Sequence, residues 1–276
     1  MYFFKNEFIP AHDVHISPND RGYYFGDGIY EVFRVYHGEL YECDAHMDRL
    51  ERTASEVKLT LPYTREQFVS MLRELISRNS LLEGTVYLQI TRGEAPRAHP
   101  FPQTAEPVML AYCNEVPRPL ATIQQGIRAI TQPDIRWLRC DLKTLNLLPN
   151  VLAKQAALDF GVQEVILHRE GIVTECSASN LMIVSNGELL THPANNLILH
   201  GITRMVVLRI ARSLGIPARE EAFTTDDLLQ AEEAFITGTT MEITPVVQVD
   251  GRPIASGTPG PVARQLQAEF ERTFAK

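Results

Sequence analysis

The sequence predicts an α+β protein built from two domains. Its 276 residues are about twice the ~150 residues of a common domain. Hydrophobic residues make up 45% of the chain and charged residues 22%, which is ordinary for a globular protein and excludes a disordered, collagen-like or coiled-coil chain. Candidate strands and helices alternate without a regular βαβ repeat, and this favours an α+β architecture over a doubly wound sheet.

The first third of the chain predicts a sheet with two helices. The segment IYEVFRVY is rich in β-branched and aromatic residues and is followed by a turn at His37-Gly38-Glu39, the pattern of a hairpin strand. Two later segments carry apolar residues at helical spacing. The expected elements are strands over Ile29–Tyr36, Thr85–Thr91 and Pro107–Asn114, a helix capped by Asp44 and running to about Val57, and a helix after Thr64.

A proline-rich segment predicts the domain boundary. Val116-Pro117-Arg118-Pro119-Leu120 holds two prolines within three residues, and such a segment cannot lie inside a helix or a central strand. We therefore predict a smaller N-terminal domain over residues 1–118, a linker over 119–122 and a C-terminal domain over 123–276.

The C-terminal domain is expected to mix strands with two helices. A tight turn at Arg169-Glu170-Gly171 separates two of its apolar segments. The expected elements are strands over Ile127–Thr131, Glu164–His168, Leu181–Val184, Ala234–Thr237 and Val246–Val249, and helices over Asn146–Phe160 and Thr203–Leu214.

Charge, hydropathy and cysteine content argue against some classes of binding partner and indicate a cellular location. The formal net charge of −8 argues against non-specific binding to nucleic acid or to anionic membranes. No apolar run approaches the ~20 residues of a membrane-spanning helix, and the start MYFFKNEFIP does not have the pattern of a signal peptide. The four cysteines form no CxxC pair, so we expect a cytoplasmic protein.

Common cofactor and metal motifs are absent. His12 and His15 form a lone HxxH without further ligands nearby, so no metal site is predicted. The motifs GxxxxGK[ST], GxSxG and HExxH do not occur. Phe25-Gly26-Asp27-Gly28 lacks the third glycine of a dinucleotide fingerprint and precedes a strand, so we interpret it as a turn.

One lysine has surroundings that suggest chemistry. Lys143 is one of only five lysines and lies among apolar residues, close in sequence to the only tryptophan. An ammonium group buried alone is costly, so a lysine in such a place is either paired or functional. Desolvation favours the neutral, nucleophilic amine, which suits a lysine that forms a Schiff base. The alternative is an exposed lysine in a loop.

Three other segments add a carboxylate and anion-binding groups. Glu175 lies among small polar residues in VTECSASN, Gly201 and Thr203 begin a predicted helix, and Thr237-Gly238-Thr239-Thr240 offers hydroxyl and amide donors. A helix start binds anions through its free N–H groups and its dipole. Each segment taken alone is typical of a polar loop, a cap or a turn. Together with Lys143, they provide the groups that pyridoxal 5′-phosphate (PLP) requires.

Motifs over nearly the whole chain make it similar to the fold-type-IV PLP enzymes. These comprise branched-chain aminotransferases, D-amino-acid transaminases, aminodeoxychorismate lyases and (R)-amine transaminases. Within this group the chain most resembles the D-amino-acid transaminases. The likeness to the whole group rests on Asp20-Arg21-Gly22, FGDGIYE from Phe25, HMDRL from His46, Lys143, Glu175 and Gly201-Ile202-Thr203-Arg204. The closer likeness to the D-amino-acid transaminases rests on Asp134–Asp141, Thr191–Asn196 and Pro96–His99.

The resemblance implies a fold, an activity and a role for each matching residue. The fold would be a smaller N-terminal α/β sandwich and a larger C-terminal α+β barrel-like domain. The activity would be ping-pong transamination between D-amino acids and 2-oxo acids, for instance D-alanine plus 2-oxoglutarate giving pyruvate plus D-glutamate. Lys143 would form the imine with PLP and transfer the proton, Glu175 would face the pyridine nitrogen, and Leu199 would pack on the ring face. The phosphate would be bound by Arg49, Ile202, Thr203 and Thr239. The substrate, chiefly its α-carboxylate, would be bound by Tyr30 and Thr240, together with Arg97 and His99 from the partner subunit of a homodimer.

Some positions depart from the D-amino-acid enzymes, and other activities stay open. Cys176, Ala178, Gly238 and Met241 stand where serines are expected, which puts phosphate affinity and substrate range in question. A branched-chain L-aminotransferase, an aminodeoxychorismate lyase and an (R)-amine transaminase share the lysine, although Arg97 and His99 count against the first. A non-catalytic PLP-binding protein is the alternative from a different class.

Overall fold

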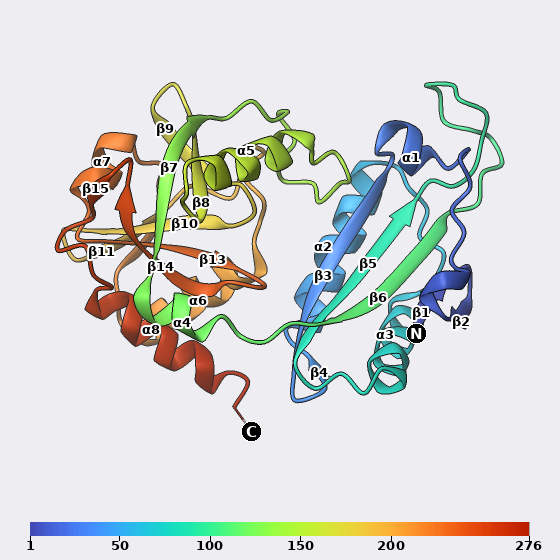
Figure 1. The fold of residues 1–276 in the computed structure, drawn as a ribbon, viewed down its shortest axis with the longest axis horizontal. Coiled ribbons are helices and arrows are strands. Elements are labelled where there is room, and N and C mark those ends of the chain that lie inside the picture. Colours follow the sequence, from blue (N-terminus) through green and yellow to red (C-terminus); the bar gives the residue numbers. More distant parts are fainter. Residues whose placement is uncertain (276) are drawn as a thin grey trace. The chain divides into compact units, whose positions relative to one another are not determined.

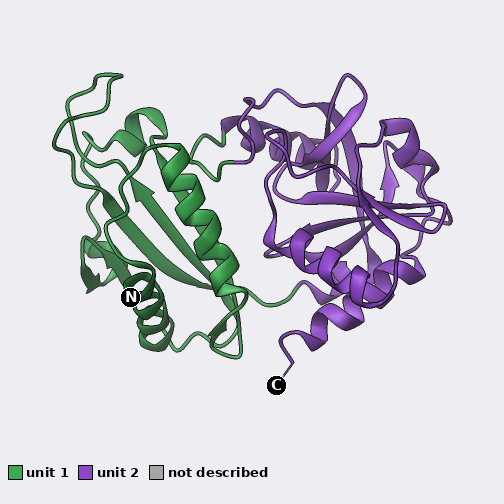
Figure 2. Ribbon diagram, turned by 180° about the vertical axis from the view of Figure 1, so that it is seen from behind, with its two compact units in different colours: residues 1–118, 142–147 green, residues 119–141, 148–276 purple. Residues whose placement is uncertain are grey.

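The computed structural model (Figure 1) describes residues 1–275, which form two compact units. The first unit contains Met1–Arg118 and Leu142–Leu147, and the second contains Pro119–Asp141 and the chain from Leu148 onward (Figure 2). The chain therefore leaves the second unit for one short segment, and that segment carries Lys143.

This division differs from the predicted one in two places. Leu142–Leu147 belongs to the first unit because its backbone bonds to a strand there: the Tyr30 N–H donates to the Lys143 carbonyl, and the Leu145 N–H donates to the Gly28 carbonyl, both at 3.0 Å. The expected linker 119–122 begins the second unit, since Pro119 is the N-cap of helix α4 (Leu120–Gln125). Proline is tolerated at a helix start because its missing N–H has no partner there.

The first unit is an antiparallel sheet covered by helices. Its six strands run in the order β2-β1-β6-β5-β3-β4, and every neighbouring pair is antiparallel. The strands are β1 (Tyr2–Phe4), β2 (Glu7–Ile9), β3 (Gly28–Tyr36), β4 (Glu39–Leu40), β5 (Gly84–Thr91) and β6 (Val108–Glu115). The helices are η1 (Ala11–Asp13), α1 (Arg21–Phe25), α2 (Cys43–Glu56) and α3 (Arg65–Arg78).

Helices α2 and α3 share one apolar core with the sheet. Met47 of α2, Leu72 of α3 and Phe33 of β3 are each fully buried in it. The helix expected after Thr64 is α3, and Thr64 caps it through a reciprocal capping box with Gln67. The predicted cap of α2 was wrong: this helix begins at Cys43, so Asp44 lies in its first turn, where a negative charge complements the helix dipole.

The second unit is built on a curled, mixed sheet. Its strand order is β12-β11-β10-β13-β14-β7-β8-β9, with β15 paired to β14, and β7 runs parallel to both β14 and β8. Strand β9 returns beside β10, so the sheet curls as the predicted barrel-like domain requires. The strands are β7 (Ile127–Pro133), β8 (Glu164–Arg169), β9 (Ile172–Cys176), β10 (Asn180–Ser185), β11 (Glu188–Thr191), β12 (Ala218–Glu220), β13 (Glu233–Gly238), β14 (Glu242–Val249) and β15 (Arg252–Pro253).

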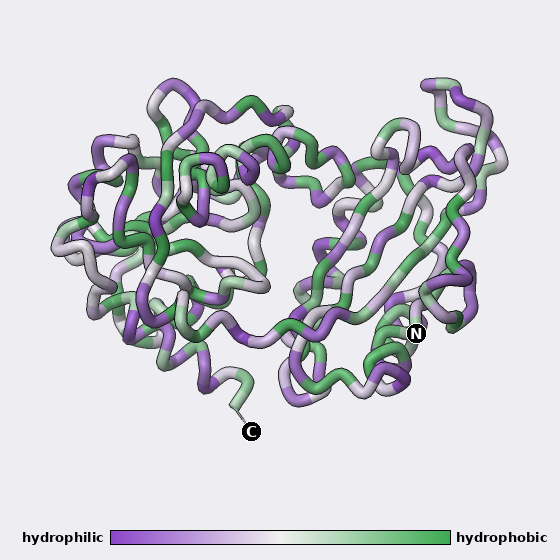
Figure 3. The backbone as a smooth tube through the Cα atoms, in the orientation of Figure 1, coloured by the Kyte–Doolittle hydropathy of each residue, from purple (hydrophilic) through white to green (hydrophobic). Residues whose placement is uncertain are grey.

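Four further helices complete the second unit: α5 (Leu148–Asp159), α6 (Ile202–Ser213), α7 (Thr225–Gln230) and α8 (Pro261–Arg272). Strands β10 and β13 contribute to its apolar core, and Ile183 and Ile236 there have no exposed surface. The colouring of Figure 3 shows hydrophobic stretches along the strands and mainly hydrophilic turns between them. Every helix in the described chain is too short or too polar to cross a bilayer.

The predicted strands and helices are present with ends shifted by a few residues, and the α+β class is confirmed. The exception with functional weight is β9. The segment around Glu175 was open to interpretation as a solvated polar loop, but Val173–Cys176 are buried in the sheet. The elements that the pattern did not predict are mostly short, and they include β1, β2, β9, β11, β12, α1, α4, α7 and α8.

Candidate active site

Lys143 lies beside an aromatic ring in the first unit. Its Nζ is 4.3 Å from the centroid of the Tyr30 ring, and the side chain is half-buried rather than fully buried. In the described chain no carboxylate lies within 4 Å of this nitrogen. Trp137, expected as a neighbour from the sequence, belongs to the second unit and is 44% exposed. The Lys143 Nζ is therefore not held in an ion pair within the described chain.

A row of stacked tyrosines fixes the ring next to Lys143. The Tyr30 ring stacks on Tyr87 at 5.7 Å, Tyr87 on Tyr112 at 5.1 Å, and Tyr112 on Tyr2 at 4.9 Å between ring centroids. These residues come from four strands of one sheet, and stacking of this kind restrains each ring. Burial raises the pKa of Tyr87 well above its ordinary value, so its hydroxyl stays protonated.

A buried ion cluster lies on the neighbouring positions of β3 and α2. Glu31 has no exposed surface and accepts from Nε and Nη2 of Arg49 at 2.8 and 2.9 Å, while His46 Nδ1 lies 2.8 Å from its second oxygen. Burial alone would raise the pKa of the Glu31 carboxyl, but Arg49 and His46 hold it well below its usual range. Burial lowers the pKa of His46 despite the contact with Glu31. Arg49, expected at the cofactor phosphate, is thus oriented by Glu31.

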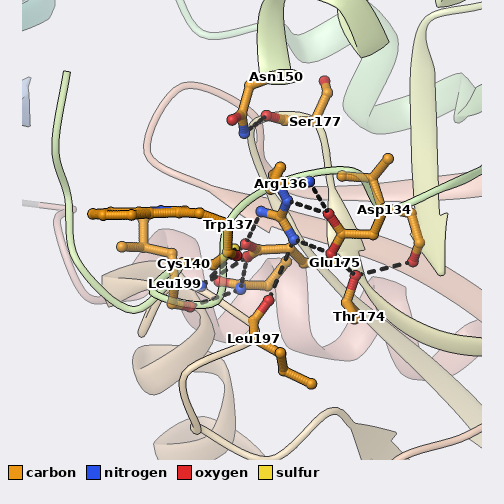
Figure 4. A network of polar contacts seen from close by, with 12 residues as sticks. Asp134, Arg136, Trp137, Cys140, Asn150, Thr174, Glu175, Ser177, Leu197 and Leu199 are labelled. Carbon is orange, nitrogen blue, oxygen red and sulfur yellow. Dashed lines mark hydrogen bonds and ion pairs between the residues drawn. The ribbon is translucent and has the colours of Figure 1, made fainter. Parts of the chain in front are cut away.

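Glu175 is a buried carboxylate with three donors in the second unit (Figure 4). It is 4% exposed at the end of β9. Arg136 Nη1 donates to Oε1 at 2.5 Å, Asn180 Nδ2 donates to Oε2 at 2.8 Å, and the Leu199 N–H reaches both oxygens at 3.1 Å. Burial raises the pKa of Glu175 to about 7, although Arg136 opposes the shift. The carboxylate is therefore oriented and poised near neutrality.

Arg136 owes its orientation to a second buried carboxylate. Asp134, whose side chain has no exposed surface, accepts from Nε and Nη2 of Arg136, both at 2.9 Å, and also from Arg169 at 3.2 Å and Thr174 at 3.0 Å. The charge of Arg136 is divided between Asp134 and Glu175, which explains why one close guanidinium does not hold Glu175 fully ionised. Sequence reasoning gave neither Asp134 nor Arg136 a role. The sequence feature that could have indicated this pair is an acidic and a basic residue two positions apart in an apolar segment.

The start of α6 offers backbone donors close to Glu175. Its N-cap is Gly201, which has no side chain with which to cap the helix. A Cβ at Gly201 would lie 2.0 Å from Oδ1 of Asn180, so only glycine permits this close approach. Ile202 and Thr203 are buried in the first turn, where free N–H groups and the helix dipole attract an anion.

The turn between β13 and β14 adds hydroxyl groups to the same region. Thr237 pairs with Asn180 in the β10–β13 register, so this turn and the start of α6 meet around one residue. Thr237 is 1% exposed, and its Oγ1 has no hydrogen-bond partner within the described chain. A buried hydroxyl without a partner calls for one. Thr239 and Thr240 follow in the turn, half-buried and exposed respectively.

Arg97 and His99 are exposed in the loop after β5 of the first unit. Both contact Phe25: the Arg97 guanidinium carbon is 5.2 Å from the ring centroid, and the two ring centroids of His99 and Phe25 are 5.6 Å apart. Of the predicted site residues, the structure thus places Lys143, Tyr30, Arg49, Arg97 and His99 in the first unit and Glu175, Leu199, Ile202, Thr203, Thr239 and Thr240 in the second.

Residues 28–249 match the amino-transferase class IV family, and the chain belongs to this family. It is 46% identical over 271 residues to the D-alanine aminotransferase of Staphylococcus aureus (strain N315), an alignment that covers 98% of this chain and 96% of the relative. The D-alanine aminotransferase of Listeria monocytogenes (serotype 1/2a, strain 10403S) is 46% identical over 269 residues, covering 96% and 93%.

Solved structures show the same fold. The branched-chain amino acid aminotransferase from Escherichia coli has a TM-score of 0.91 at 26% identity, with 99% of this chain and 94% of that chain covered. The branched-chain aminotransferase from the thermophilic archaeon Thermoproteus uzoniensis, solved with norvaline, has a TM-score of 0.87 at 27% identity, with 98% and 93% covered. The expected fold and family are confirmed, and the protein is an aminotransferase.

Proposed function

We propose that the protein is a PLP-dependent transaminase that moves an amino group between D-amino acids and 2-oxo acids, for instance from D-alanine to 2-oxoglutarate. Support for the D-amino acid comes from the relatives named D-alanine aminotransferase, which align over nearly the whole chain. The structural observation that carries the proposal is the buried, oriented Glu175 carboxylate beside an uncapped helix start.

The residues present fit PLP. When bound, PLP supplies an aldehyde that condenses with amines and a ring that accepts electrons from the substrate α-carbon. Lys143 has a nucleophilic group without a competing carboxylate in the described chain, and Glu175 would face the ring nitrogen. The orphaned Thr237 hydroxyl and the uncapped start of α6 suit a phosphate group. We assign the phosphate to Arg49, Ile202, Thr203 and Thr239, and the ring face to Leu199.

Glu175 would keep the ring nitrogen protonated. Its donors Arg136, Asn180 and Leu199 hold both oxygens in place, so the carboxylate is already oriented before it meets a cation. A cationic ring nitrogen beside this carboxyl would lower its pKa, because an opposite charge favours the ionised form. Glu175 would therefore be ionised whenever the ring is protonated.

Lys143 would move a proton in the reaction. With PLP bound, Lys143 would hold the cofactor through its Nζ, and the same nitrogen would act as the base that moves the proton of the substrate α-carbon. Tyr30 and Thr240, with Arg97 and His99 from the partner subunit of a homodimer, would bind the substrate, chiefly through its α-carboxylate. An arginine fork binds a carboxylate through two parallel hydrogen bonds, which selects amino acids over simple amines.

All four cysteines are free thiols, which supports the proposed cytoplasmic location.

A panel of D- and L-amino acids with 2-oxoglutarate tests the proposal. We expect D-alanine and other D-amino acids to yield D-glutamate, with absorption changes as each half-reaction proceeds. Transfer from L-leucine, L-valine or L-isoleucine alone would overturn the D specificity in favour of a branched-chain enzyme. Pyruvate release from aminodeoxychorismate without an acceptor would instead indicate a lyase, and turnover of simple amines would indicate an amine transaminase. Failure to turn over any amine or amino acid after loading with PLP would indicate a non-catalytic protein.

A further inference from the structure

The ring of Phe25 contacts both side chains that we assign to the substrate carboxylate. The loop after β5 lies beside α1 (Figure 1). The Arg97 guanidinium carbon is 5.2 Å from the Phe25 centroid, and the His99 ring is 5.6 Å away at an interplanar angle of 45°. A guanidinium is attracted to an aromatic face, and tilted rings pack favourably. Phe25 is half-buried as the last residue of α1, so one fixed ring restrains two exposed side chains.

Arg21, at the start of the same helix, holds the backbone of the same loop. Its Nη1 donates to the carbonyls of Ala98 at 2.6 Å and Pro100 at 3.4 Å, and its Nη2 donates to the carbonyl of His99 at 3.3 Å. Arg21 is only 3% exposed, and its guanidinium carbon is 4.9 Å from the Phe25 ring. The backbone and the side chains of the loop are therefore restrained from one helix.

A shared carboxylate anchors Arg21 without engaging Arg97. Asp27 accepts from Nε of Arg21 at 2.7 Å and from Nε of Arg92 at 3.0 Å. Arg92 in turn packs on Phe101, with its guanidinium carbon 3.7 Å from that ring. Across residues 1–275 no carboxylate pairs with Arg97. The cluster thus presents an uncompensated positive charge on an ordered loop.

We propose that Phe25 and Arg21 are positioning residues that set the substrate range of the enzyme, because they hold Arg97 and His99 in the arrangement that accepts an α-carboxylate. This inference rests on the proposed function, which assigns Arg97 and His99 to that carboxylate. A long exposed arginine loses conformational freedom when it binds a ligand, and prior restraint on a ring reduces that cost. Phe25 and Arg21 together form a platform for Arg97 and His99, and this platform favours amino and oxo acids with a free α-carboxylate as a class.

The kinetic test compares three variants of the PLP-loaded enzyme. Phe25→Leu keeps an apolar side chain but removes the ring. We expect the KM for D-alanine and for 2-oxoglutarate to rise about tenfold, which is equivalent to the loss of about one hydrogen bond. We expect kcat to change less than about threefold. Phe25→Tyr restores the ring and should restore KM. Tyr23→Leu is the matched control, since Tyr23 lies on the same helix and is 78% exposed.

Arg21→Lys tests the backbone part of the platform. One ammonium cannot reproduce a fork that reaches three carbonyls, so KM should again rise about tenfold while kcat changes little. A KM that stays within about twofold of the unmodified enzyme in both Phe25→Leu and Arg21→Lys would overturn the proposal. A fall in kcat at constant KM would overturn it as well, because positioning of a binding group acts on KM.

A measurement without turnover separates this proposal from the proposed function. The Cε1 proton of His99, identified by its loss in His99→Gln, should shift in the NMR spectrum of Phe25→Leu because the nearby aromatic ring is gone, and acetate should perturb it less in the variant than in the unmodified protein. Identical spectra and identical acetate responses would overturn the platform even if D-alanine is a substrate. If the unmodified protein transaminates no D-amino acid, the proposed function fails, while these spectra still decide whether Phe25 restrains His99.

Discussion

The buried carboxyl of Glu175 predicts a specific dependence of stability on pH. The perturbation is Glu175→Gln, which removes the titrating group and keeps its size. Glu175 is 4% exposed, and burial raises its pKa from 4.5 to about 7. The folded protein thus holds this proton more tightly than the unfolded chain does. Its stabilising contribution is complete below about pH 4.5 and is lost as the pH rises to about 7.

The size of the effect follows from the shift. A difference of about 2.5 pKa units at about 1.4 kcal/mol each corresponds to about 3.5 kcal/mol over the whole titration, most of which falls between pH 4.5 and 7.5. Between pH 4.5 and 7.5, the stability of the unmodified protein should therefore fall by about 3 kcal/mol relative to the Gln variant. Burial lowers the pKa values of His46 and His192 as well, but these residues are present in both proteins, so their contribution cancels in the difference.

Urea unfolding of both proteins, freed of cofactor, checks this prediction at several pH values. The protein has one tryptophan, and Trp137 lies in the unit that contains Glu175, so its fluorescence reports on the relevant unit. A difference between the two proteins that stays constant within about 1 kcal/mol would refute the reasoning, since it would mean that Arg136 offsets burial completely. Adding PLP should flatten the dependence, because a protonated ring at the proposed position would keep the Glu175 carboxylate ionised.

Four further substitutions test other parts of the structure. Lys143→Ala should abolish the visible absorption band that forms when PLP joins the lysine, and a retained band would show that another lysine serves. Arg97→Ala should weaken D-amino acids about ten- to hundredfold more than simple amines, and equal losses in steady-state kinetics would remove its assignment to the carboxylate. Glu31→Gln should destabilise the first unit by about 3 kcal/mol at pH 7, because it removes the Glu31 charge from the buried Arg49; a urea midpoint at pH 7, followed by far-UV circular dichroism because Trp137 lies in the other unit, that is unchanged from the native protein would contradict this. Thr64→Ala should cost about 1 kcal/mol in the same assay through loss of the α3 cap, and an unchanged midpoint would show that the cap contributes nothing.

Short-range sequence patterns by themselves determined much of this protein. Strands β3 and β5 and helices α2 and α3 lie where composition and helical periodicity predict them, because β-branched and aromatic residues favour strands and burial of one helix face repeats every 3.6 residues. The helix after Thr64 was predicted in the same way, and its cap involves residues only three apart. Lys143, Glu175 and Gly201 were singled out in the same way, by residue type and immediate neighbours.

Only the tertiary structure decided which side chains contact one another within each unit. Arg136 and Glu175 are 39 positions apart, and nothing in either segment specifies the other as a partner. Leu142–Leu147 bonds to β3, more than 110 positions away, which moves Lys143 into a different unit from the one its place in the chain suggested. Hydrogen bonds between distant strands and charge pairing in buried sites depend on which surfaces meet once the chain has collapsed. A one-dimensional pattern carries the preference of each segment, but not the identity of what it packs against.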